Sequence, residues 1–169
     1  MTRKKQPRIL SIAPTTRGFG FAVLEEDKLV DWGVKVVKGN KNTMSLVRIE
    51  ELIDHYHPEI MVLEDHTKSR RAPRIQELGG KIITLAKSRQ VKVKTFTRKQ
   101  VRGVFFSQGT GTKFAVAEAL ARLFPEELGS QLPPKRRLWT SEDSRMDIFD
   151  AVALVVAFRM RRIRRTLPK

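Results

Sequence analysis

The sequence predicts an α/β domain in which a mixed five-stranded sheet is covered by helices on both faces. Three observations support this fold class: five short segments have the pattern of strands, the first three follow one another without a helix, and the last two alternate with helical segments. Strands joined by short turns pair antiparallel, whereas strands separated by a helix run parallel. We therefore expect the first three strands to be antiparallel. The length of 169 residues fits one domain.

Each strand is predicted by a short apolar run or by an alternation of apolar and polar residues. Apolar runs cover residues 8–13, 18–25 and 59–64, and alternating runs cover residues 29–37 and 91–96. Apolar residues at helical spacing predict helices over residues 43–56, 75–88, 97–105, 113–123 and 144–163. Residues 66–74, 107–112 and 125–142 lack such patterns, so we expect loops there. We assign residues 1–7 to a flexible basic arm, 8–163 to the domain and 164–169 to a basic tail.

The charge of the chain points to a polyanionic partner. Lysine and arginine number 34 against 18 acidic residues, which gives a net charge of +16. The basic residues gather in three clusters: Lys68 with Arg70, Arg71 and Arg74; Lys135 with Arg136 and Arg137; and Arg159, Arg161, Arg162, Arg164 and Arg165 with Lys169. Clustered charge favours nucleic acid over a basic surface that serves solubility or ribosome association. An anionic membrane is the rival partner, but the last stretch has little apolar face to insert.

Composition excludes several other classes. The chain has no cysteine, which excludes disulfides and cysteine-based zinc sites, and its 3 histidines do not suggest a histidine-rich metal cage. No apolar run approaches the roughly 20 residues of a membrane helix. The basic start is interrupted too early for a signal peptide, so we expect a cytoplasmic protein. The segment 109–113, GTGTK, lacks the Walker spacing, so we expect no nucleotide cofactor.

Three carboxylates are candidates for a metal site. Glu64 ends a buried apolar strand, where an unpaired charge is costly. Asp147 and Asp150 are three residues apart and share one face of the last predicted helix. Oxygen ligands of this kind suit Mg²⁺ or Mn²⁺, which can serve phosphodiester hydrolysis. The alternative is that Glu64 pairs with Arg70 or Arg71 and that the aspartates favour a helix N-terminus.

Aromatic residues and one histidine have structural and functional interpretations. Trp139 lies in the basic loop at 125–142 and is a candidate for stacking on a base. We expect Phe105 and Phe106 to pack in the core or at a dimer interface rather than to insert into nucleic acid. His66 follows Glu64 closely, and we expect it to be a surface histidine.

Four segments in order resemble the RuvC-type Holliday-junction resolvases of the ribonuclease H-like superfamily. Residues 9–18, ILSIAPTTRG, are similar to the family's opening strand and turn, and residues 62–64, VLE, to its second catalytic position. Residues 97–101 and 109–116 resemble its Pro-x-x-Val-Lys and Gly-x-Gly-x-x-x-Lys region. Residues 147–153, DIFDAVA, resemble its closing helix. The resemblance spans about residues 8–163.

The resemblance implies a ribonuclease H-like sheet of five strands and a homodimer that cuts four-way DNA junctions with Mg²⁺. It makes Glu64, Asp147 and Asp150 metal ligands, and it places Lys113 near the scissile phosphate. One departure matters: Ala13 stands where the family has its first catalytic Asp. Three explanations stay open, namely an engineered inactivation, a natural protein that only binds, and a site completed by another carboxylate such as Asp65 or Asp143.

We therefore expect a metal-dependent endonuclease that resolves Holliday junctions in recombination and repair, with activity in doubt because of Ala13. The alternatives are a non-catalytic binder of branched or structured nucleic acid, and a ribosomal-RNA-processing nuclease of the YqgF type. The residues expected to contact DNA are basic: Arg17, Lys68, Arg70, Arg71, Arg74, Arg98, Arg102, Lys113, Lys135, Arg136 and Arg137.

Overall fold

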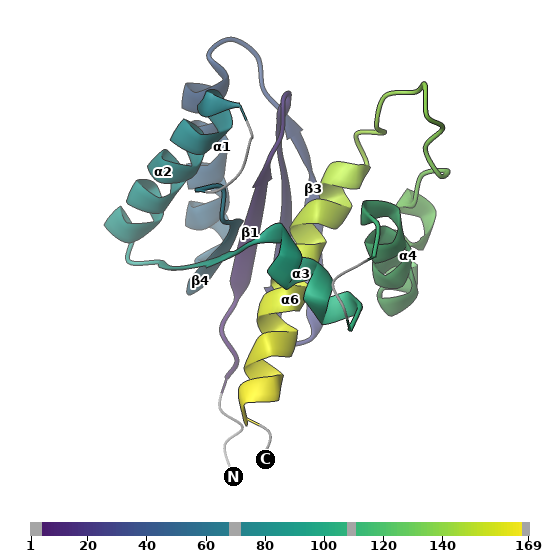
Figure 1. Cartoon of the computed structure of the whole chain (residues 1–169). Coiled ribbons are helices and arrows are strands. Elements are labelled where there is room, and N and C mark those ends of the chain that lie inside the picture. Colours follow the sequence, from purple (N-terminus) through teal and green to yellow (C-terminus); the bar gives the residue numbers. More distant parts are fainter. Residues whose placement is uncertain (1–4, 68–71, 108–110, 167–169) are drawn as a thin grey trace.

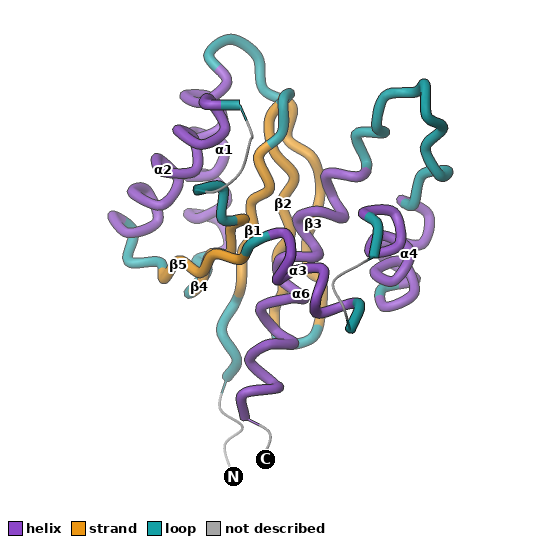
Figure 2. The backbone as a smooth tube through the Cα atoms, in the orientation of Figure 1, coloured by secondary structure: helices purple, strands orange, loops and turns teal. Residues whose placement is uncertain are grey.

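The computed structural model, which describes residues 5–67, 72–107 and 111–166, is built around one five-stranded sheet. Its strands are β1 (Ile9–Pro14), β2 (Gly18–Glu25), β3 (Lys28–Val36), β4 (Ile60–Glu64) and β5 (Lys92–Phe96). Their spatial order is β3-β2-β1-β4-β5 (Figures 1 and 2). β1, β2 and β3 pair antiparallel, and β4 pairs parallel with both β1 and β5. The predicted mixed sheet and its antiparallel start are confirmed.

Helices cover both faces of the sheet. α1 (Lys41–Tyr56) and α2 (Pro73–Ser88) lie on one face, while α3 (Arg98–Phe105), α4 (Lys113–Leu123) and α6 (Met146–Thr166) lie on the other (Figure 1). Strand alternation divides β1 between two cores: Leu10 and Ile12 pack towards α1 and α2, and Ile9 and Ala13 pack towards α6. The side chains that face α6 at the ends of β1 and β4 therefore border the same space.

α6 packs closely against the centre of the sheet. Its residues 148–158 are buried except for Asp150, so a charged residue occurs within an otherwise apolar stretch. The buried Ser11 hydroxyl of β1 donates a hydrogen bond of 2.6 Å to the carbonyl of Ala151. At Gly20 of β2 an added Cβ would lie 2.1 Å from the carbonyl oxygen of Asp147. Only glycine permits this approach, which fixes the start of α6 over the sheet.

Two segments differ from the sequence-based expectations. The loop expected at 125–142 contains the short helix α5 (Pro125–Leu128) and the 3₁₀ turn η1 (Gly129–Gln131), because Leu128 is fully buried and anchors them. α6 begins at Met146 and continues to Thr166, three residues beyond the expected end. Met160, near the end of this helix, is 39% exposed. In the part of the chain that the structure describes, no helix is long and apolar enough to cross a membrane.

Candidate active site

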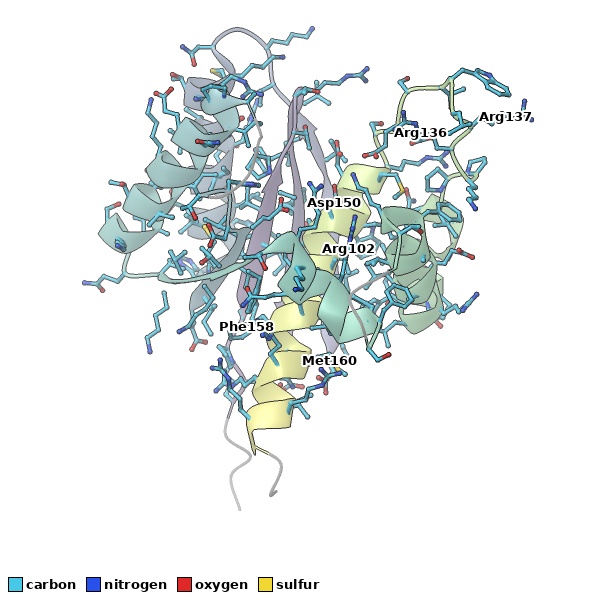
Figure 3. The ribbon with its side chains drawn as sticks, viewed as in Figure 1. Arg102, Arg136, Arg137, Asp150, Phe158 and Met160 are labelled. Atoms are coloured by element: carbon cyan, nitrogen blue, oxygen red, sulfur yellow. The ribbon has the colours of Figure 1, made fainter. Side chains whose placement is uncertain are left out.

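A cavity lies where the ends of β1 and β4 meet the first turns of α6. Ala13 and Pro14 come from β1, Glu64 from β4, and Asp150 from α6. The remaining lining residues come from α3, α4 and α6: Arg98, Val101, Arg102, Lys113, Val116, Phe149, Ala153 and Leu154. Figure 3 shows Arg102 and Asp150 on the neighbouring elements α3 and α6. The lining is thus mostly apolar, with two carboxylates and three cations among its residues.

Three carboxylates converge beside this cavity. Oxygen atoms of Glu142, Asp147 and Asp150 all lie within 4.8 Å of one another. The three-residue spacing of the two aspartates places both on the same side of the first turns of α6. Glu142 reaches them from the loop before the helix. Burial raises the pKa of Asp150; Lys113 opposes this rise, whereas Glu142 and Glu64 add to it.

Lys113 supplies the counter-charge for this group. Its Nζ lies 2.5 Å from Glu142 Oε1 and 3.0 Å from Asp150 Oδ2. Burial acts to lower the pKa of Lys113, but the charges of Asp150 and Glu142 outweigh it, so the pKa is raised. The residue stands at the start of α4, which Thr112 caps by accepting a hydrogen bond from the backbone of Ala115. A lysine held as a cation among carboxylates marks the place where positive charge is favourable.

Glu64 lines the same cavity from the end of β4. Its charge contributes to the raised pKa of Asp150, although Glu64 is not in the closest carboxylate group among the described residues. Arg98 Nε lies 3.3 Å from Glu64 Oε1, and His66 Nδ1 lies 3.6 Å from Oε2. His66 is only 7% exposed, so the expectation of a surface histidine is wrong. It is buried because it lies beneath α2, where its ring lies 4.0 Å from the position of a Cβ built on Gly79.

The structure brings Glu142 into the site rather than either of the two carboxylates considered from the sequence. Ala13 lines the cavity at the end of β1, 8% exposed, so its methyl group stands where a longer acidic side chain would enter. The carboxylate of Asp65 accepts hydrogen bonds from the backbone and hydroxyl of Thr67. The carboxylate of Asp143 is paired with Arg145. Glu142 was missed because it lies in an irregular loop without periodicity; its position beside Asp143 was the only sequence signal.

The expected DNA-contacting residues fall into different settings. Arg98 and Arg102 line the cavity, whereas Arg17 is exposed at the turn between β1 and β2. Arg74 donates hydrogen bonds to Asn42 and to the carbonyl of Thr15, so it joins α2 to neighbouring segments. Lys135, Arg136 and Arg137 are exposed on the loop that leads to α6. Lys68, Arg70 and Arg71 lie outside the described residues.

Two of the aromatic residues pack in the protein and one is exposed. Phe105 and Phe106 are half-buried and pack against the core beneath α6. Trp139 is 80% exposed, as expected of a residue in the basic loop. At the end of α6, Arg159 pairs with Asp27 and Arg161 lies over the Phe96 ring. The last arginines therefore lie along the helix away from the carboxylate group.

Comparisons with known proteins agree with the observed fold. No protein-family profile matches the chain. The chain is 27% identical over 117 residues to a crossover junction endodeoxyribonuclease RuvC from Hydrogenovibrio crunogenus, with 63% of this chain and 68% of that protein covered. Thermus thermophilus RuvC superposes with a TM-score of 0.69 at 18% identity, covering 94% of this chain and 97% of that one.

Two further solved structures have the same architecture. T. thermophilus RuvC in complex with a Holliday junction substrate gives a TM-score of 0.70 at 18% identity and covers 95% of this chain and 98% of that one. The fowlpox virus Holliday junction resolvase gives 0.57 at 15% identity, with coverages of 92% and 99%. The chain is related in sequence to a RuvC endonuclease, and it has the ribonuclease H-like fold of the RuvC-type Holliday-junction resolvases.

Proposed function

We propose that this protein is a metal-dependent endonuclease that binds four-way DNA junctions as a homodimer in the cytoplasm and hydrolyses their phosphodiester bonds. The observation that carries the proposal is the convergence of Glu142, Asp147 and Asp150. Asp150 pairs with Lys113 and lines the same cavity as Glu64. The relation to a RuvC endonuclease supports the choice of branched DNA as the substrate.

The donor set fits a hard divalent cation such as Mg²⁺, with Mn²⁺ as a substitute. Carboxylate oxygens are the ligands that these ions prefer, and three of them lie within 4.8 Å of one another. Asp147, Asp150 and Glu142 would hold the ion, and Glu64 lines the same cavity. A bound divalent cation supplies Lewis-acid polarisation of the phosphodiester and lowers the pKa of water.

The protein's own cations would position the DNA and balance its charge. Arg98 and Arg102 line the cavity, where their guanidinium groups suit phosphate oxygens. Lys113, which is paired with two carboxylates, would turn towards the scissile phosphate once a cation compensates those carboxylates. Its charge would then stabilise the negative charge that develops in the transition state.

Ala13 favours a second candidate, a protein that binds junctions without cutting them. The methyl group offers no ligand at the end of β1, and Lys113 already balances part of the carboxylate charge. The two candidates share the DNA-binding surface and differ only in whether Glu142 replaces the missing ligand. Cleavage and metal binding therefore separate them.

Cleavage of a labelled four-way junction in Mg²⁺ or Mn²⁺ tests the proposal. The parent, Ala13→Asp and Asp147→Asn proteins are compared, with Glu142→Gln and, as its neighbouring control, Asp143→Asn. Cutting that Asp147→Asn and Glu142→Gln abolish and Asp143→Asn retains would support a site completed by Glu142. Cutting by Ala13→Asp alone would show an intact scaffold disabled at one position. Tight binding without cutting by any variant would favour the second candidate, a protein that binds junctions without cutting them.

Two binding measurements are independent of turnover. Mn²⁺ affinity, followed by electron paramagnetic resonance, should fall by at least about tenfold in Glu142→Gln and stay unchanged in Asp143→Asn. Junction affinity should fall by roughly 10³-fold or more between 50 and 200 mM salt if six or more phosphates are contacted. Equal affinity at both salt concentrations would contradict the electrostatic part of the proposal. Binding to structured RNA in preference to junction DNA would favour a ribosomal-RNA-processing nuclease.

A further inference from the structure

The loop that leads into α6 carries the two most exposed large apolar side chains among the described residues. Leu138 is 96% exposed and Trp139 is 80% exposed, while Trp32, the other tryptophan, is half-buried against the core. A tryptophan in water contributes nothing to the core and leaves a large apolar area hydrated. The fold therefore does not account for the placement of these two side chains.

Hydrogen bonds hold this pair at the tip of a defined turn. The backbone N–H and the hydroxyl of Thr140 donate to the carbonyl of Arg137, at 3.1 and 3.0 Å. Arg136 Nε donates to the carbonyl of Thr140 at 2.7 Å and so closes the turn from the other side. Leu138 and Trp139 occupy its two central positions. A tip fixed in this way presents its side chains with part of their ordering cost already met.

A run of positive charge leads directly into the tip. Lys135, Arg136 and Arg137 precede it directly and are exposed. Figure 3 shows Arg136 and Arg137 on the loop that extends from the start of α6, well away from the sheet. An apolar partner protein gains nothing from three cations beside the tryptophan, whereas a nucleic-acid strand offers phosphates to the cations and a base to the indole.

The tip is close to the carboxylate group along the chain. Glu142, which pairs with Lys113, follows Trp139 by three residues, and three residues span at most about 11 Å. Successive nucleotides of a stacked DNA strand rise by about 3.4 Å. A base at the tip would therefore belong to a nucleotide within a few positions of the phosphate in the cavity.

The geometry points to a stacking site for an unpaired base: Trp139, with Leu138 beside it, receives a base that is unstacked at the branch point of the DNA, and the adjacent cations hold its phosphates. This site rests on the proposed function for its choice of branched DNA. It adds a specificity element, because a fully paired duplex has no free base face to offer.

Fluorescence of Trp139 provides the direct test. In a Trp32→Phe background Trp139 is the sole tryptophan, and its emission is titrated with a four-way junction, with a single strand and with a fully paired duplex. We expect quenching by the first two and much less by the duplex. An emission that no nucleic acid changes, at concentrations that saturate binding, would overturn the inference.

Affinity measurements with matched variants complete the test. Trp139→Ala should weaken junction and single-strand binding by about 5- to 150-fold, the range of one stacked base, and leave duplex binding unchanged. Trp139→Phe should retain most of the affinity. Arg137→Gln should lower the affinity for the junction, the single strand and the duplex alike. A Trp139→Ala variant that binds the junction as the parent does, or loses duplex binding equally, would refute a base-stacking role. Because these readouts do not involve cleavage, an inactive protein that still shows them would refute the nuclease proposal alone.

Discussion

Replacing Lys113 by methionine removes the cation that balances Glu142 and Asp150 while keeping a side chain of similar length. The Nζ lies 2.5 and 3.0 Å from the two carboxylates, and all three side chains are between 33% and 39% exposed. Unit charges 3 Å apart attract by about 5 kcal/mol at an effective dielectric of 20, but solvent screens groups this exposed. We therefore expect a loss of about 1–2 kcal/mol in unfolding free energy, which lowers Tm by roughly 2–8 °C.

The divalent cation should reverse this loss. Without Lys113 the carboxylates repel one another, so Mg²⁺ should raise the Tm of Lys113→Met by more than it raises the Tm of the parent. A ligand at 100 times its Kd stabilises by about 2.7 kcal/mol, which is large enough to measure by thermal unfolding. Lys81→Met, which removes an exposed lysine paired with Glu77 on α2, is the control and should change little. An unchanged Tm in Lys113→Met, with no added response to Mg²⁺, would refute the reasoning.

Two further predictions concern packing and pH. In Gly20→Ala the new Cβ would lie 2.1 Å from the carbonyl oxygen of Asp147, so the start of α6 must shift. We expect a loss of about 1–3 kcal/mol in unfolding free energy, measured by chemical denaturation. The control, Gly80→Ala, has open space around the new Cβ and should not destabilise the protein. Burial, then the hydrogen bond to Asp31, raises the pKa of Tyr56 to about 12, so the folded protein keeps a proton that the unfolded chain loses above about pH 10. Stability should therefore fall as pH rises from 10 to 12, and this fall should be smaller in Tyr56→Phe; equal pH profiles for the two proteins would contradict the assignment.

The sheet could be predicted from the sequence because its information is local. Each strand carries its own apolar run or alternation, and the absence of a helix before the third strand indicates the antiparallel start. The short helix α5 was not predicted, since a single buried residue, Leu128, anchors it within a proline-rich segment. The burial of His66 was missed for a related reason: it depends on α2 packing over the end of β4, which no pattern near His66 reports.

The residues of the candidate site also differ in whether local sequence or tertiary packing determines their positions. The spacing of Asp147 and Asp150 places them together from the sequence alone, because a helix repeats its faces every three to four residues. Glu64 and Ala13 share a face because they end neighbouring parallel strands on the same side of the sheet. Glu142 has no such regular element, and its position depends on Lys113, 29 residues earlier. A contact of this kind is set by tertiary packing.

A carboxylate ligand supplied by a loop is held in place differently from one supplied by a strand. A carboxylate at position 13 would be fixed by the register between β1 and β4, whereas Glu142 is held by its pair with Lys113 and by the loop that ends in α6. The same loop carries the exposed Trp139, so a DNA strand bound at the tip also restricts Glu142. Ordering by one ligand lowers the cost of binding the other. If Glu142 is the replacement ligand, the carboxylate group is therefore best formed when branched DNA is bound, which makes the substrate itself a condition for a complete site.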